Sequence, residues 1–338
     1  MKLRYVILAA AALAAVWAAA AFPQAAPAPA AAPAPVTPLP WAYPINPPAP
    51  PAPPSTDPTL KHVPNSTKAF TQAQVTDGFN PPDWHPDGHS PMPEIVGHGR
   101  RPDVRACGYC HLPNGQGRPE NSSLAGLPAA YIVAQVADMR NGLRQSSEPS
   151  MGPPAAMLNL AKASNDEEVK IAAEYFSKLK YKPWIKVVEA KMVPKTKAVT
   201  GMLVPIEGAA SNSGGMEPIG ERIIETAQNL EPTEARDDAS PFIAYVPVGS
   251  VKKGEVLVTT GGSGKTLRCS ICHGQDLKGL ANVPFLAGRS PSYLVRQLYD
   301  IKNGSRHGAW SPLMKEAVSN LTLEDMVNIA AYVSSRMP

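Results

Sequence analysis

Two segments of the chain carry the apolar pattern of a surface helix behind a start signal. Residues 164–167 read Ser-Asn-Asp-Glu and fit a capping box, and residues 322–325 read Thr-Leu-Glu-Asp and fit its acidic variant. Behind each signal, apolar residues recur at i, i+3, i+4 and i+7, which predicts one face of an amphipathic helix. These faces consist of Val169, Ala172, Ala173 and Phe176 in the first segment and Met326, Ile329, Ala330 and Val333 in the second.

Further helices are predicted upstream of both segments. Residues 131–140 and 293–302 have helical patterns, and short helices are expected at 90–97 and 250–259. The chain therefore contains two similar helical sets. Between them, 183–249 reads as an ordered linker, in which apolar pieces such as 241–246 predict short strands or extended segments, as does 201–206.

The N-terminus has the layout of an export signal. Lys2 and Arg4 precede the uncharged segment 5–22, and Ala19 and Ala21 form an Ala-x-Ala cleavage site. We expect a signal peptide over 1–21; the alternative is an uncleaved N-terminus that associates with the membrane. The next segment, 22–59, is rich in alanine and proline and is expected to be a disordered tether, because proline fixes φ and removes backbone donors.

Composition narrows the possible functions. The formal net charge is only +4, from 32 basic and 28 acidic residues, with no basic stripe of the kind that binds nucleic acid. The chain has four cysteines, and all four lie in two copies of the motif Cys-x-x-Cys-His.

This motif is typical of covalent c-type haem attachment. Two thiols about one helical turn apart can each add to one haem vinyl group, and the adjacent histidine can bind the iron. The sequence therefore predicts two covalently attached haem c groups. The first copy is Cys107, Cys110 and His111, and the second is Cys269, Cys272 and His273.

The cysteines have three other possible interpretations. Two Cys-x-x-Cys pairs could form a four-cysteine zinc site, but zinc would not explain the histidine after each pair. A thioredoxin-like redox pair would need a single motif in a βαβ context. Two structural disulfides suit an exported chain, but they too leave both histidines unexplained.

The two motifs head a duplicated unit. Counting forward from each motif histidine, the same residue types recur at equal distances without a gap. The matched pairs are Leu124 and Leu286, Ala125 and Ala287, Gly126 and Gly288, Tyr131 and Tyr293, Gln135 and Gln297, Asn141 and Asn303, Gly142 and Gly304, and Arg144 and Arg306.

The duplicated unit resembles class I cytochrome c, and the two-domain layout resembles the dihaem cytochromes c4 of bacteria. The resemblance covers about 90–180 and 250–337. It implies an all-α fold with two class I cytochrome c domains in tandem, at 78–182 and 250–338, joined by the long ordered linker 183–249 with its short extended segments.

The resemblance also implies a methionine as the second axial ligand of each iron, in the loop before the last helix of each domain. Met314 is the candidate in the second copy. In the first copy, counting back from Val169 by the number of residues that separates Met314 from Met326 gives Met157. Counting forward from His111 by about the number that separates His273 from Met314 gives Met151. We expect Met157, because helix register constrains position more than loop length does.

In this family, a proline carbonyl commonly accepts the Nδ1–H of the proximal histidine. Pro284 has this position in the second copy, but Ser122 replaces it in the first, where the hydrogen bond is expected to be held less rigidly. Tyr131 and Tyr293 are candidates to line the cofactor pocket or reach the haem propionates, with Gln135 and Gln297. Arg144 and Arg306 pair with propionates or lie on the helix surface.

The segment before the first motif contains three histidines, His85, His89 and His98, close to Asp83 and Asp87. Clustered histidine and aspartate can bind a metal. We expect instead that these residues form a loop over the first haem.

These features together predict an exported, periplasmic dihaem cytochrome that carries single electrons between redox protein partners and is not itself an enzyme. The alternatives are a haem enzyme of the thiosulfate dehydrogenase or peroxidase kind and an electron-transfer subunit of a dehydrogenase or oxidase. No cysteine is spare and both copies offer a methionine, which argues against an open, catalytic iron. The differences around the two motifs also predict unequal haem potentials.

Overall fold

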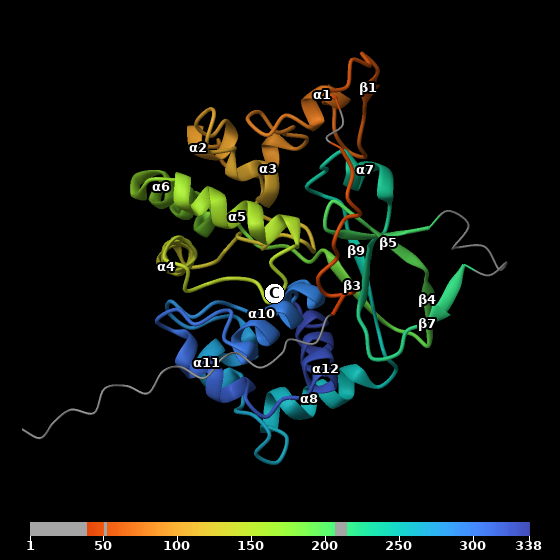
Figure 1. The fold of residues 1–338 in the computed structure, drawn as a ribbon, viewed down its shortest axis with the longest axis vertical. Helices are drawn as coiled ribbons and strands as arrows, with labels where there is room; N and C mark the ends of the chain where they lie inside the picture. Colours follow the sequence, from red (N-terminus) through yellow and green to blue (C-terminus); the bar gives the residue numbers. More distant parts are fainter. Residues whose placement is uncertain (1–38, 51–52, 207–214) are drawn as a thin grey trace, which may run out of the picture. The chain divides into compact units, whose positions relative to one another are not determined.

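The computed structural model describes residues 39–50, 53–206 and 215–338, which lie in one unit spanning Ala34–Pro338 (Figure 1). The predicted signal peptide over 1–21 and the first part of the predicted tether, 22–38, lie outside the described residues. Within the part of the chain that is described, no helix has the length and apolar character that a membrane span requires.

Both repeats have the helices that the apolar pattern predicts. The first repeat contains α2 Glu94–Gly97, α3 Cys107–His111, α4 Ala129–Arg140, α5 Gly152–Ala163 and α6 Asp166–Lys178. The second contains α8 Ser250–Thr260, α9 Ser270–His273, the 3-10 turn η2 Gln275–Leu277, α10 Pro291–Asn303, α11 Ser311–Val318 and α12 Leu323–Ser334.

The last helix of each repeat begins at a capping box. In α12, Thr322 and Asp325 form the predicted box. In α6, the box is made by Asn165 and Glu168, one residue later than the sequence pattern indicates, because the Asn165 side chain accepts from the Glu168 backbone while Ser164 bonds back to Leu160. Either box satisfies backbone donors that the first helical turn would otherwise leave free.

In the second repeat, α8 crosses α12 at very short range. Gly254 allows this approach, since a Cβ atom there would lie 1.9 Å from the backbone oxygen of Asn328. In the first repeat, α2 is shorter and packs against both α3 and α6. In the first repeat the motif helix α3 is thus linked to the last helix α6 through α2, and in the second repeat Cys269 N donates to the Val258 carbonyl of α8, which packs on α12.

Two helices were missed by sequence reasoning. The segments that hold Met157 and Met314 were expected to be loops, but they form α5 and α11. The loops were expected because the resemblance to class I cytochrome c places the methionine there, but Pro153 and Pro312 stand in the first turn of a helix. Proline is compatible with that position, because the N–H it lacks has no partner inside the helix.

The chain as a whole is not all-α, because the connecting segment 183–249, in which short strands or extended segments were expected, forms sheets. It contains a three-stranded sheet in the order β3-β9-β8, in which β3 Ile185–Glu189 runs parallel to β9 Phe242–Val246, and β8 Ile224–Ala227 runs antiparallel to β9 (Figure 1). β9 is the central strand, and Phe242, Ala244 and Val246 point into the interior. Alternate side chains of β9 are buried, which is the pattern of a strand that packs one face against the core.

The remaining elements form small pairs around this sheet. Two antiparallel pairs lie in the connecting segment and one lies ahead of the first repeat. In the connecting segment, β4 Met192–Pro194 pairs with β7 Met216–Pro218, and β5 Thr196–Val199 pairs with β6 Met202–Pro205. Ahead of the first repeat, β1 Leu60–Lys61 pairs with β2 Phe70–Thr71. Three short helices complete the fold: α1 Gln72–Val75, η1 Pro86–Gly88 and α7 Leu230–Glu234.

The described part of the predicted tether 22–59 corrects that prediction. Leu39, Trp41, Ala42 and Tyr43 are buried and belong to the hydrophobic core of the second repeat. The aromatic side chains bury apolar area that an Ala/Pro tract lacks, so this piece is part of the fold.

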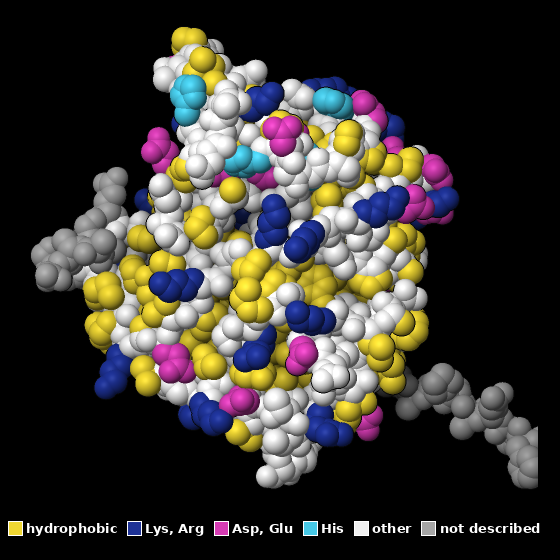
Figure 2. All heavy atoms as spheres, turned by 180° about the vertical axis from the view of Figure 1, so that it is seen from behind, with side chains coloured by type: hydrophobic (Ala, Val, Ile, Leu, Met, Phe, Trp, Pro, Cys, Tyr) yellow, Lys and Arg dark blue, Asp and Glu magenta, His cyan; other side chains and the backbone are white. Residues whose placement is uncertain are grey.

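Charged residues of both signs are interspersed on the face shown in Figure 2, with hydrophobic side chains between them. This distribution matches the small net charge of the chain.

Candidate functional site

The first Cys-x-x-Cys-His motif forms α3 and opens onto a cavity of about 360 Å³. Cys110, His111 and Tyr131 line this cavity, together with Met157 from α5. Leucine and isoleucine side chains complete much of its wall, including Leu124, Leu127 and Ile132. The motif therefore faces an apolar space that also contains the expected second axial ligand.

Each motif histidine is oriented by a backbone carbonyl. His111 Nδ1 lies 2.8 Å from the Ser122 oxygen, and His273 Nδ1 lies 2.8 Å from the Pro284 oxygen. The bond to Ser122 is therefore as short as the bond to proline, and the expected looser contact does not show in its length. A histidine that donates from Nδ1 to a carbonyl keeps the Nε2 lone pair for a metal.

Burial favours the neutral form of both imidazoles, which is the form that binds iron. It lowers the pKa of His111 and of His273, although the hydrogen bonds to Ser122 and Pro284 act in the opposite direction. The form that burial favours is the one that ligation of a metal requires.

The cysteines do not support the disulfide or zinc interpretations. Cys107, Cys110, Cys269 and Cys272 are free thiols. Among the described residues, the one group of side chains placed to hold a metal ion is His85, Asp237 and Asp238, and it contains no cysteine. Burial raises the pKa of Cys107 to about 12 and that of Cys269 to about 11, so both thiols are protonated in the absence of a bond.

The three candidate methionines lie in different surroundings. Met157 lines the cavity with His111. Met151 is fully buried in the hydrophobic core of the second repeat and does not line that cavity. Met314 packs against the same core as Cys269. These positions support Met157 and Met314 as the predicted ligands, and the ligand assignment stays a prediction.

The paired Tyr, Gln and Arg residues form one network across the two repeats. Arg144 donates to Gln135 of its own repeat at 3.0 Å and to Tyr293 and Gln297 of the other at 3.1 and 3.0 Å. Arg306 repeats this arrangement in reverse: it donates to Gln297 at 3.0 Å, and to Tyr131 and Gln135 at 3.0 and 2.8 Å.

The predicted pocket role of the tyrosines stays a prediction, but their place is now clear. Tyr131 and Tyr293 both line the first cavity, and so does Gln297. One repeat thus forms part of the wall of the other's cofactor cavity.

The cavity has the polar groups that a haem needs at its acidic edge. The Nε of Arg118 is buried without a hydrogen-bond partner in the protein, and Arg118, Arg144 and Arg236 all line the cavity. Haem carries two carboxylates, which would accept hydrogen bonds from such donors. The residues present therefore fit a haem: thiols for attachment, an oriented imidazole, an apolar wall and cationic side chains, of which Arg118 pairs with Glu120 but keeps Nε without a partner.

Several lining residues could not be found from the sequence. Asn46 and Thr200 lie far from the motif in the chain, and Arg236 belongs to the connecting segment. No repeat or motif marks these positions. The aromatic residues Trp41 and Tyr43 in an Ala/Pro-rich tract were the one available signal that the N-terminal segment packs.

The loop that was expected over the first haem lies elsewhere. His85, His89 and His98 do not line the cavity. Instead, His89 contacts Asp83 and the Tyr175 hydroxyl of α6 at 3.2 and 3.1 Å, and His98 is exposed. The segment packs beside the first repeat, where the connecting segment meets it.

Comparison with known proteins places this geometry in a family. No protein-family model matches the chain. Cytochrome c-554(548) from Halomonas halodenitrificans is 40% identical over 76 residues, which are 22% of this chain and 92% of that protein. Cytochrome c4 from Azotobacter vinelandii is 37% identical over 84 residues, covering 23% of this chain and 40% of the relative. The chain thus matches less than half the length of that cytochrome c4.

A third relative matches more of the chain at lower identity. The thiosulfate dehydrogenase electron acceptor of Thiomonas intermedia is 25% identical over 239 residues, which are 70% of this chain and 80% of that protein. Because a relative of 40% identity is matched over nearly its whole length and both motifs recur in duplicated units, the chain belongs to the c-type cytochromes, as a cytochrome c4-like dihaem protein with two covalently attached haem c groups.

Proposed function

We propose that this chain is an exported, periplasmic electron carrier that passes single electrons between redox protein partners through two haems with His/Met ligation. The proposed ligands are His111 with Met157 and His273 with Met314. When bound, haem iron supplies the one-electron chemistry by alternating between its ferric and ferrous forms. The role of the protein is to orient the ligands, exclude water and bring the two repeats together.

The observation that carries this proposal is the reciprocal network between Arg144 and Arg306. It places Tyr293 and Gln297 of the second repeat in the wall of the first cavity. The two repeats are therefore joined beside the first cavity by buried or half-buried polar contacts. A junction of this kind suits electron transfer between the two haems inside one molecule.

The proposal is tested by the reactions of the purified holoprotein. A carrier takes up two electrons per molecule from a one-electron donor and returns them to ferricyanide. We expect this behaviour, together with a low-spin spectrum and no carbon monoxide binding by the reduced wild type. Carbon monoxide binding at one haem of the wild type would contradict closed His/Met ligation and favour an enzyme.

A second candidate is a subunit that serves a sulfur-oxidising dehydrogenase. The likeness to the thiosulfate dehydrogenase electron acceptor of Thiomonas intermedia over most of the chain favours it. Thiosulfate with ferricyanide separates the possibilities. A free carrier or acceptor shows no thiosulfate-dependent reduction of ferricyanide by itself, whereas a haem enzyme does. Co-purification with a dehydrogenase would then distinguish the acceptor from the free carrier.

A further inference from the structure

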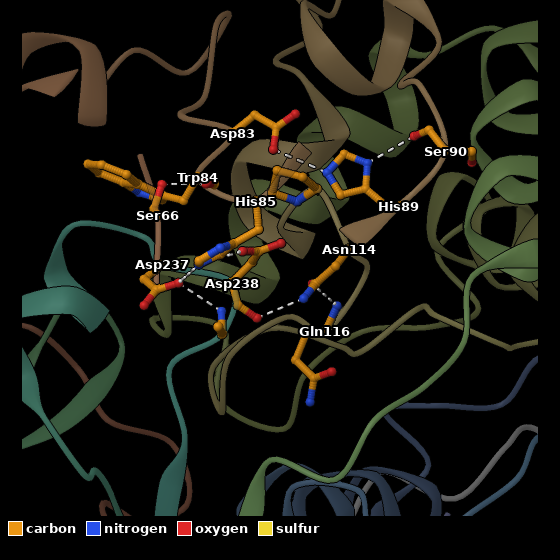
Figure 3. Close-up of polar contacts among 12 residues, drawn as sticks. Ser66, Asp83, Trp84, His85, His89, Ser90, Asn114, Gln116, Asp237 and Asp238 are labelled. Atoms are coloured by element: carbon orange, nitrogen blue, oxygen red, sulfur yellow. Dashed lines mark hydrogen bonds and ion pairs between the residues drawn. The ribbon is translucent and has the colours of Figure 1, made fainter. Parts of the chain in front are cut away.

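A second group of possible ligands lies away from both haem motifs. His85, Asp237 and Asp238 have ligand atoms that all lie within 4.8 Å of one another, and Figure 3 shows the His85 ring next to both aspartates. His85 precedes the first repeat, whereas the aspartates belong to the connecting segment. The fold thus brings together residues that are about 150 positions apart in the chain.

The geometry of the turn points both carboxylates toward the histidine. Asp237 Oδ1 lies 2.9 Å from His85 Nε2 and also accepts from the Ala239 backbone N–H at 2.9 Å. Ser240 N donates to the Asp237 carbonyl and closes the turn. Consecutive residues of an extended strand would point in opposite directions. This turn is what lets Asp237 and Asp238 reach the same point.

The carboxylate of Asp238 has an unsatisfied oxygen. Its side chain is 3% exposed, and Oδ1 is buried without a hydrogen-bond partner in the protein. His85 Nε2 lies 3.9 Å from this oxygen, which is beyond hydrogen-bond distance. Burying a carboxylate oxygen without a donor is costly, and a second buried carboxylate beside it adds repulsion. A cation at this point would remove both penalties.

A cavity gives this point access to solvent. It measures about 700 Å³ and is lined by polar groups, among them Ser66, His85, Asn114, Gln116 and Asp238. An ion could enter through it, and water in it could complete the coordination shell. A metal site needs such an entry path as well as its protein ligands.

We propose that His85, Asp237 and Asp238 form a site for a divalent transition-metal ion of the Zn²⁺ type. One imidazole and two carboxylates make a donor set that Zn²⁺ uses, whereas Ca²⁺ and Mg²⁺ take oxygen ligands only. The three side chains supply three ligands and leave a fourth position open toward the cavity. The site is separate from the haem irons and does not depend on the proposed electron-carrier function.

Such an ion would connect the segment before the first repeat to the surroundings of the first haem motif. Asn114, three residues after His111, donates to the Asp238 carbonyl at 2.7 Å. Arg236, next to Asp237, stacks on the Tyr109 ring inside the motif at 3.6 Å and donates to its carbonyl at 2.7 Å. The metal would hold the turn that positions both contacts.

The test is a titration of the chelator-treated holoprotein with Zn²⁺, followed by calorimetry and by thermal unfolding. We expect one saturable site and a rise in melting temperature with Zn²⁺. Asp238→Asn keeps the shape of the side chain but removes the charge, and it should weaken binding by roughly 100-fold or more, since loss of even an outer-shell partner costs 10–100-fold.

The matched control is Asp103→Asn, which removes an exposed carboxylate that does not line this cavity. It should bind Zn²⁺ like the wild type. If Asp238→Asn does not fold, as judged by its haem spectrum without metal, His85→Gln takes its place with the same expected loss. Equal affinities for the wild type, the control and the ligand variant would overturn the proposal, as would the lack of a saturable site in the wild type.

Discussion

Arg144 and Arg306 form an antiparallel backbone bridge between the two repeats, and each side chain donates to the glutamines of both. The two residues occupy equivalent positions of the duplicated unit. Their contacts are therefore nearly self-complementary, as in the isologous interface of a symmetric dimer. Duplication within one chain has produced an internal interface of this kind.

The first prediction concerns the charge of this network. Arg144→Gln should lower the reduction potential of the first haem by roughly 60 mV, a tenfold change in the one-electron equilibrium. Arg144 lines the first cavity, and removing a cation there favours the ferric form, which carries one more positive charge. Spectroelectrochemical titration of the holoprotein measures both haems.

The control for this variant is Arg140→Gln, four residues earlier in the chain, at the end of α4. Arg140 pairs with Asp166 at 2.5 Å and takes no part in the network. It should leave both potentials nearly unchanged. Equal shifts for the two variants would mean that the network does not act on the haem.

The second prediction separates the candidate axial methionines. Met157→Ala should let the reduced first haem bind carbon monoxide, because the proposed ligand is removed. Met151→Ala should keep the wild-type spectrum but lower the free energy of unfolding by about 2–5 kcal/mol, since it leaves a cavity in a fully buried core position. Carbon monoxide binding and chemical denaturation measure the two effects. If Met151→Ala alone opens the iron, the assignment must be reversed.

The third prediction concerns the N-terminal segment that was expected to be disordered. Tyr43 donates from its hydroxyl to Asp300 Oδ1 at 2.7 Å, and Arg296 donates to the Ala42 carbonyl at 2.8 Å. Tyr43→Phe should lower the free energy of unfolding by about 1–3 kcal/mol, because buried Asp300 loses a hydrogen-bond donor. Ile45→Ala, at an exposed neighbouring position, should cost much less. Similar losses in denaturant titrations would argue against specific docking.

The fourth prediction is a pH dependence of stability from Glu225. Burial raises the pKa of this carboxyl above 4.5, although hydrogen bonds from Ser290 and Ser292 oppose the shift. Between pH 4.5 and the higher folded pKa, the folded state therefore holds a proton that the unfolded state has released. The free energy of unfolding should fall as pH rises through this window.

Glu225→Gln should flatten this pH dependence, because the neutral amide does not titrate. Denaturant unfolding measured upward from pH 4.5 should show the variant gaining on the wild type. The control is Glu221→Gln, an exposed acid in the same segment, whose profile should follow the wild type. A variant profile parallel to that of the wild type would show that Glu225 is not the group responsible.

Much of this molecule could be inferred from local patterns. The two motifs, the equal spacing of the repeats and the capping signals all lie within short stretches of chain, where chemistry and helix period act directly. The helix over Ser250–Thr260 and the strand over Phe242–Val246 were predicted close to their observed bounds. The helices around Met157 and Met314 were missed because the resemblance to class I cytochrome c, and not the residue pattern of these segments, assigned them to loops.

The sequence by itself determined what the chain can bind, because thiols and a histidine at fixed spacing specify covalent haem without reference to distant residues. Only the tertiary structure decided which residues surround each motif. Whether Arg144 meets Gln297 of the opposite repeat, and whether His85 meets Asp237, depends on contacts between residues far apart in the chain. Such contacts are set by which surfaces bury most apolar area and satisfy most polar groups together, and no local pattern carries that information.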